Sequence, residues 1–250
     1  MFDGDAWEEY YDVILGISDL VAQRLPELAT DHDQPTWRQV PAAYLARCRR
    51  LVLGMDLLRK EGMADLVGIL MRVTFETWLH GTWVALDGED ALDRLVAAHE
   101  REVDKIIRLA GLDMCLDPNT AAPEEPVPNV EMLAGIVGEL LTADGDRGGK
   151  SVSWSYDLVY RAESMRGVHG RLGAVIDHLA DLGPTVGIVE SRRETGDGRG
   201  ELLWAGVLVA ILARRVFRLF GVDTDELDDL TEPFTNLTEP AEWAASRAEP

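Results

Sequence analysis

Cysteine and basic residues are scarce in this 250-residue chain, and each shortage excludes a class of protein. Two cysteines, Cys48 and Cys115, cannot supply the several disulfides of a small secreted domain, and two thiolates are too few for a zinc site built from cysteine alone. Lysine and arginine total 24 against 45 aspartates and glutamates, so the formal net charge is -21. Because a field of that sign repels phosphate backbones, we expect no sequence-independent binding to nucleic acid.

Long apolar runs are missing as well. The most apolar run, from Leu202 to Ala213, is too short to span a bilayer, and two arginines follow it directly. The first twelve residues are acidic and lack the basic start and apolar stretch of a secretory signal. We therefore expect a cytoplasmic protein that does not contact membranes.

What the chain does contain is helical periodicity. With 46% hydrophobic residues and seven tryptophans it can bury a large core. Apolar residues recur every three or four positions in seven segments, so we predict an all-α fold, a single bundle of about seven helices. The expected helices are 5–25, 41–60, 63–86, 89–110, 130–141, 155–182 and 201–220. The bundle domain should cover 1–222, with a proline-rich internal loop at 116–129 and an acidic C-terminal tail at 223–250 that begins with a short helix near Asp225. No alternation supports a sheet.

The helix at 63–86 is the expected centre of the bundle. Its apolar residues cover nearly the whole circumference, which is typical of a helix packed on every side. Arg72, Glu76 and His80 nevertheless sit at i, i+4 and i+8, so they form one polar stripe along it. Buried charges cost several kcal/mol, roughly, unless they are paired and hydrogen-bonded. The stripe therefore requires a polar partner.

A second polar group lies on the helix expected at 155–182. Arg161 and His169 fall within its apolar stripe, and Tyr160 and Ser164 flank that stripe. If the two helices meet, the groups form a polar pocket in which His169 is the acid/base, Arg161 stabilises a phosphate, and an anion or ligand is bound by a set of five residues. That ligand-binding set is Arg72, Glu76, His80, Tyr160 and Ser164. The alternative is a buried ion-pair network that only fixes the helix register.

Metal and nucleotide sites are weaker alternatives. Glu76 and His80 could share a cation with His99, Glu100 or His169, but the paired Glu-x-x-His motifs of bundle metal sites are missing, so we expect no metal and no cofactor. His99 is more simply a core histidine. The run from Asp144 to Ser151 is similar to a phosphate-binding loop, but it starts with Asp instead of Gly and follows a helix instead of a strand. It is therefore interpreted as a glycine-rich turn.

Two sequence blocks resemble an uncharacterised bacterial family known only as a domain of unknown function. One is an apolar helix with Leu-x-Arg followed by Phe-Glu, here Leu70, Arg72, Phe75 and Glu76. The other is a Gly-Lys-Ser turn leading to Tyr-Arg-x-x-Ser and His-Gly, which comprises Gly149, Lys150, Ser151, Tyr160, Arg161, Ser164, His169 and Gly170. The resemblance implies an all-helical fold in which Arg72, Glu76, Arg161 and His169 cluster, and it implies no established activity.

A more distant analogy is to the HEPN superfamily of helical ribonucleases from toxin and phage-defence systems. That superfamily carries an Arg, four to six residues and then a His on one helix near a dimer interface. Here seven residues separate Arg161 from His169, and two separate Arg166 from His169. The chain therefore departs from the signature at the positions on which ribonuclease activity depends.

These patterns lead to one expected function and two alternatives. The expectation is a helical protein whose buried Arg/Glu/His cluster binds a small anionic ligand or forms a regulatory interface with a protein partner. The first alternative is a metal-independent, HEPN-like ribonuclease in which the basic loop at 191–200 contacts RNA; no other segment favours nucleic acid. The second is a purely structural polar network in an interaction scaffold. A homodimer is compatible with all three, and whether the protein is an enzyme stays open.

Overall fold

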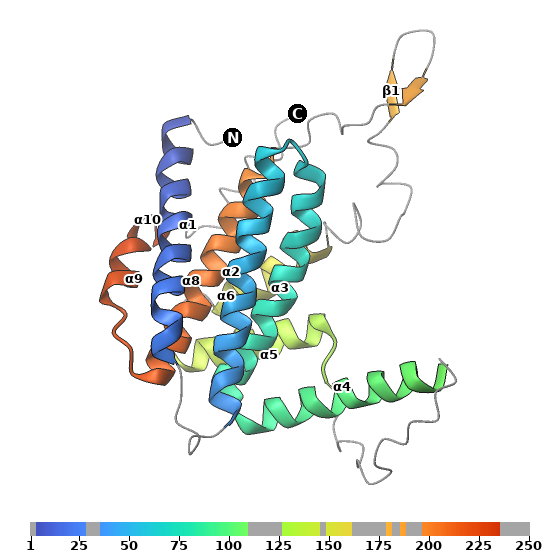
Figure 1. Cartoon of the computed structure of the whole chain (residues 1–250), viewed down its shortest axis with the longest axis vertical. Coiled ribbons are helices and arrows are strands. Elements are labelled where there is room, and N and C mark those ends of the chain that lie inside the picture. Colours follow the sequence, from blue (N-terminus) through green and yellow to red (C-terminus); the bar gives the residue numbers. More distant parts are fainter. Residues whose placement is uncertain are drawn as a thin grey trace.

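The computed structural model is a helical bundle (Figure 1), and it describes residues 4–28, 36–109, 127–145, 149–161, 179–181, 186–188 and 197–235. The α-helices are α1 (Gly4–Arg24), α2 (Gln39–Lys60), α3 (Ala64–Asp87), α4 (Glu89–Leu109), α5 (Val130–Ala143), α6 (Gly149–Ser155), α8 (Arg199–Phe220), α9 (Asp225–Leu230) and α10 (Glu232–Thr235). Short 3-10 helices, η1 (Leu25–Leu28) and η2 (Thr36–Arg38), precede α2, and a π-helical segment, η3 (Tyr156–Arg161), continues α6. The all-α fold class predicted from the sequence is confirmed.

Capping residues that are recognisable in the sequence set the ends of two helices. Gly62 has φ +74°, a conformation that favours glycine. Its backbone N–H donates to the carbonyl of Arg59, and the backbone N–H of Met63 donates to the carbonyl of Leu58, so a glycine-type C-cap ends α2. The link to α3 is therefore short, and the two helices pack as the predicted hairpin. Asn129 caps α5 as predicted, because its side chain accepts a 2.9 Å hydrogen bond from the Met132 amide.

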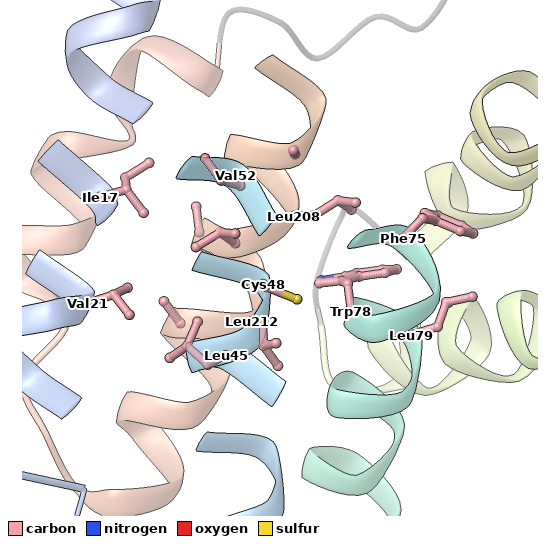
Figure 2. Close-up of a cluster of buried hydrophobic side chains, with 14 of the residues drawn as sticks. Ile17, Val21, Leu45, Cys48, Val52, Phe75, Trp78, Leu79, Leu208 and Leu212 are labelled. Carbon is pink, nitrogen blue, oxygen red and sulfur yellow. The ribbon is translucent and has the colours of Figure 1, made fainter. Parts of the chain in front are cut away.

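The core lies between α1, α2, α3 and α8, which run side by side along the long axis of the molecule (Figure 1). Figure 2 shows how their apolar faces meet. The labelled side chains are Ile17 and Val21 from α1, Leu45, Cys48 and Val52 from α2, Phe75, Trp78 and Leu79 from α3, and Leu208 and Leu212 from α8. Gly81 lets α3 approach its neighbours closely, because a Cβ there would lie 2.7 Å from Cβ of Tyr44 and 3.1 Å from Leu212.

Shorter elements cover this core. α5 and η3 pack on α3, α6 packs on α5, and α9 and α10 pack on α1 (Figure 1). Leu227 and Phe234 join the same hydrophobic core, and Arg214 of α8 pairs with Asp228 at 2.6 Å. Residues 225–235, which belong to the predicted acidic tail, are thus packed on the bundle, and the division into a domain and a tail stays a prediction.

Two predicted elements are wrong in detail. Gly149 to Ser151 form the first turn of α6 instead of a glycine-rich turn. The helix expected at 155–182 is π-helical from Tyr156 to Arg161, and residues 162–178 lie outside the described residues. Leu179 lies in strand β1 (Leu179–Asp181), which pairs antiparallel with β2 (Val186–Ile188).

The predicted position of the central helix is confirmed, but its first half is less buried than predicted. α3 lies within one residue of its predicted bounds, and its second half is buried. Its first half has an open side, because Leu66 is 38% exposed and Ile69 and Val73 are half-buried. His99 on α4 is exposed, so the expectation of a core histidine is wrong. Among the described residues, no helix is both long and apolar enough to cross a membrane.

Candidate functional site

The polar stripe of α3 meets its partner in the π-helical segment η3. An Nη atom of Arg72 donates a 2.8 Å hydrogen bond to the hydroxyl of Tyr160, and that hydroxyl donates a 2.7 Å hydrogen bond to Oε1 of Glu76. The sequence thus correctly placed these three candidate residues in one cluster. A π-helical turn inserts an extra residue into a helix and is found disproportionately at functional sites. Here the π-helical segment carries Tyr160, which bridges Glu76 and Arg72.

The guanidinium of Arg72 is held in one orientation. Its Cζ lies 4.7 Å from the centroid of the Tyr160 ring, a cation–π distance. The Tyr160 ring is itself fixed, because it stacks on Tyr156 at 5.2 Å and packs against Phe75 at 6.1 Å. Since two aromatic rings position the tyrosine, the arginine that rests on it is positioned as well.

Arg72 is not fully satisfied by these contacts. Its Nε is buried and makes no hydrogen bond; it lies 3.4 Å from Oε1 of Glu76, which is an electrostatic contact only. The side chains of Arg72 and Glu76 are 17% and 33% exposed. A guanidinium carries five N–H donors, and an unfilled buried donor calls for an explanation. The site therefore holds an oriented cation with donor capacity to spare.

The electrostatics of Tyr160 favour the neutral phenol. Burial raises the pKa of Tyr160, the carboxylate of Glu76 raises it further, and Arg72 opposes both. The phenol consequently stays protonated at neutral pH and keeps its proton on the hydrogen bond to Glu76.

His80 extends the stripe by one turn. It is half-buried, and its ring centroid lies 6.2 Å from that of Tyr44 on α2. Burial lowers the pKa of His80, while the charge of Glu76 and the backbone carbonyl of Glu76 act in the opposite direction. The net direction favours a neutral imidazole at neutral pH, which can both donate and accept a hydrogen bond.

The remaining predicted site residues are not placed. The backbone of Arg161 ends η3, but its side chain lies outside the described residues, as do Ser164 and His169. Most of the basic loop at 191–200 is also outside them; its described end is the start of α8. The predicted catalytic pair of Arg161 and His169 thus stays a prediction.

A second polar network was missed by the sequence analysis. Asp56 on α2 is only 7% exposed. Its carboxylate accepts hydrogen bonds from the Tyr11 hydroxyl at 3.0 Å and from Arg59 at 3.1 Å, and it forms an ion pair with Lys60 at 2.8 Å. Burial acts to raise the pKa of Asp56, but the hydrogen bonds from Lys60, Arg59 and Tyr11 outweigh it and lower that pKa. An acid inside an apolar stripe, with bases three and four residues later, is the signal that could have revealed this network.

Trp7 joins this second network to the start of α8. The Cζ atoms of Arg59 and Arg199 lie 5.3 Å and 5.1 Å from its ring centroid, and Trp7 is 2% exposed. Tyr11 stacks on the same ring at 5.7 Å. The network therefore ties α1, α2 and α8 together at one end of the bundle.

Within the described ranges, no three side chains of His, Cys, Asp or Glu are grouped so that they could hold a metal ion. No family model, no curated protein and no solved structure matches the chain. The resemblance to a family of unknown function and the HEPN analogy accordingly stay predictions.

Proposed function

We propose that the protein is a cytoplasmic helical binding protein in which Arg72 anchors a small anionic ligand beside Glu76 and Tyr160. The observation that carries the proposal is the state of Arg72: its guanidinium is oriented by the ring and hydroxyl of Tyr160, while its Nε is buried without a hydrogen bond. An arginine fixed in this way is pre-organised for a carboxylate or phosphate oxygen.

The network offers a way to admit such an anion. A ligand oxygen that reaches Arg72 replaces Glu76 as its electrostatic partner, because the 3.4 Å contact between them is not a hydrogen bond. Glu76 keeps the hydrogen bond that it accepts from the Tyr160 hydroxyl, so its charge remains partly compensated. His80, neutral and half-buried one turn away, supplies a further polar contact for the ligand.

The test is anion-dependent thermal unfolding of the full chain. Phosphate is added against chloride at constant ionic strength, and the wild type should be stabilised by about 1.4 kcal/mol at ten times the Kd. Arg72→Gln should lose this gain, and Tyr160→Phe should reduce it because the arginine is no longer held. Arg24→Gln is the matched control: Arg24 also pairs with glutamates, Glu27 and Glu226, but at the surface.

Two results would contradict the proposal. An equal phosphate effect in the wild type and in Arg72→Gln would place the anion elsewhere. A wild type that responds to phosphate no more than to chloride would leave the network with a structural role only. The ribonuclease alternative rests on His169 and is tested separately: His169→Ala should abolish RNA cleavage by the purified protein if that activity exists.

A further inference from the structure

An apolar patch lies at the α2–α3 end of the bundle. Leu53 and Leu57 of α2 are 36% and 60% exposed, and Met63, the N-cap of α3, and Leu66 of α3 are 46% and 38% exposed. The first pair is one helical turn apart, and the second pair follows directly after the short link between the helices. We call these four residues the hairpin patch. Single exposed leucines are ordinary, but four exposed apolar side chains on the adjoining ends of one helical hairpin indicate a contact surface.

Unpaired positive charge borders the hairpin patch. Arg50 and Arg47 precede Leu53 by three and six residues, and both are exposed on the same side of α2. Neither forms a hydrogen bond or an ion pair with another described residue. In a chain with net charge -21, two unpaired arginines beside an apolar surface favour an acidic occupant.

The chain leaves the described bundle close to this surface. The ring of Phe234, one residue before the end of α10, lies 6.2 Å from that of Tyr10 on α1. The next residue of α1, Tyr11, is hydrogen-bonded to Asp56, the neighbour of Leu57. Two helix diameters, roughly 20 Å, therefore separate the end of α10 from the hairpin patch. Eight residues of extended chain span about 26 Å, which is sufficient.

The segment that follows has the matching chemistry. Residues 236–250 contain one aromatic side chain, Trp243, with Glu239 and Glu242 before it, and their three glutamates against one arginine give a net charge of 1 − 3 = −2. We propose that residues 236–250 dock on the hairpin patch, with Trp243 covering Leu57 and Met63 and the glutamates facing Arg47 and Arg50. Because the segment is tethered, its effective concentration is on the order of millimolar, and weak contacts are enough to hold it.

Disulfide trapping in the full chain tests this contact. In a Cys115→Ser background, Leu57→Cys is combined with Ala244→Cys, which leaves Trp243 in place; the remaining Cys48 is buried. Ile106→Cys with Ala244→Cys is the control, because Ile106 is a 62% exposed apolar residue of α4, which begins at the other end of the bundle (Figure 1). We expect the intramolecular disulfide to form at least about tenfold faster with Leu57→Cys than with Ile106→Cys. Trp243→Ala and Arg47→Glu/Arg50→Glu should each bring that rate down towards the control.

Three outcomes would overturn the proposal. The first is an equal rate for the two cysteine pairs. The second is a fast rate that Trp243→Ala leaves unchanged. The third is a disulfide between two molecules on a non-reducing gel, because a second copy of the chain would then cover the patch. Circular dichroism of each variant confirms that the helices are retained.

Discussion

Two networks in this bundle each combine a tyrosine, a carboxylate and an arginine, but their hydrogen bonds are arranged differently. In each, a tyrosine hydroxyl donates to a carboxylate that lies one helical turn from an arginine: Tyr11 to Asp56 beside Arg59, and Tyr160 to Glu76 beside Arg72. In the first network the acid is at the centre and receives three donors. In the second the tyrosine is at the centre and joins Arg72 to Glu76. Nε is buried without a hydrogen bond in both Arg59 and Arg72, so that atom does not distinguish the two networks.

The difference separates a structural network from a candidate binding site. Asp56 is 7% exposed and its charge is fully met, so that network contributes by holding α1 to α2. Glu76 is 33% exposed, accepts a hydrogen bond from Tyr160, and lies at a longer ion-pair distance of 3.4 Å from Arg72. Residue type alone therefore says little about the role; the exposure of the carboxylate and the number of donors that it receives separate the two networks.

The largest expected contrast is in stability. Asp56→Ala should cost about 2–3 kcal/mol, because it leaves Arg59 and the hydroxyl of Tyr11 without their acceptor, whereas Glu76→Ala should cost about 1 kcal/mol. Urea unfolding at neutral pH measures both. A Glu76→Ala variant that is as unstable as Asp56→Ala would remove the distinction between the two networks.

Acid should affect the Asp56 network next. The folded-state pKa of Asp56 lies below its unfolded value of about 3.9. The stability that this carboxylate contributes is then fully present above that unfolded pKa and is lost as the pH falls through the folded pKa. Urea unfolding between about pH 5 and pH 2 should show a decline that is shallower in Asp56→Asn. Equal slopes in the two proteins would contradict the lowered pKa.

The smallest effect concerns His80 and reports the charge of Glu76. The folded pKa of His80 lies below its unfolded value of about 6.5, so its contribution to stability is present above that value and declines as the pH falls through the folded pKa. Glu76→Gln removes a charge that raises this pKa and should lower it further. An NMR titration of the His80 ring measures the shift, and an unchanged or raised value would contradict the geometry.

Much of the fold was predictable because helices are local. The bounds of α3 and α4, the caps at Gly62 and Asn129, and the α2–α3 hairpin all follow from spacing, turn residues and capping side chains within a few positions of one another. Local pattern failed at Leu179, where helical spacing extends past the point at which a strand forms. It failed also at His99, whose apolar stripe continues beyond the part of α4 that packs on the core.

The sequence by itself determined the all-α class, the order of the main helices and the fact that Arg72, Glu76 and His80 share one face. Only the tertiary structure decided what meets that face. The tyrosine that bridges Arg72 and Glu76 comes from 88 residues beyond the arginine, and the one that binds Asp56 comes from 45 residues before it. Periodicity shows which side chains lie together on one helix, but hydrogen-bond partners belong to a different helix, and their satisfaction depends on packing at the scale of a few tenths of an ångström.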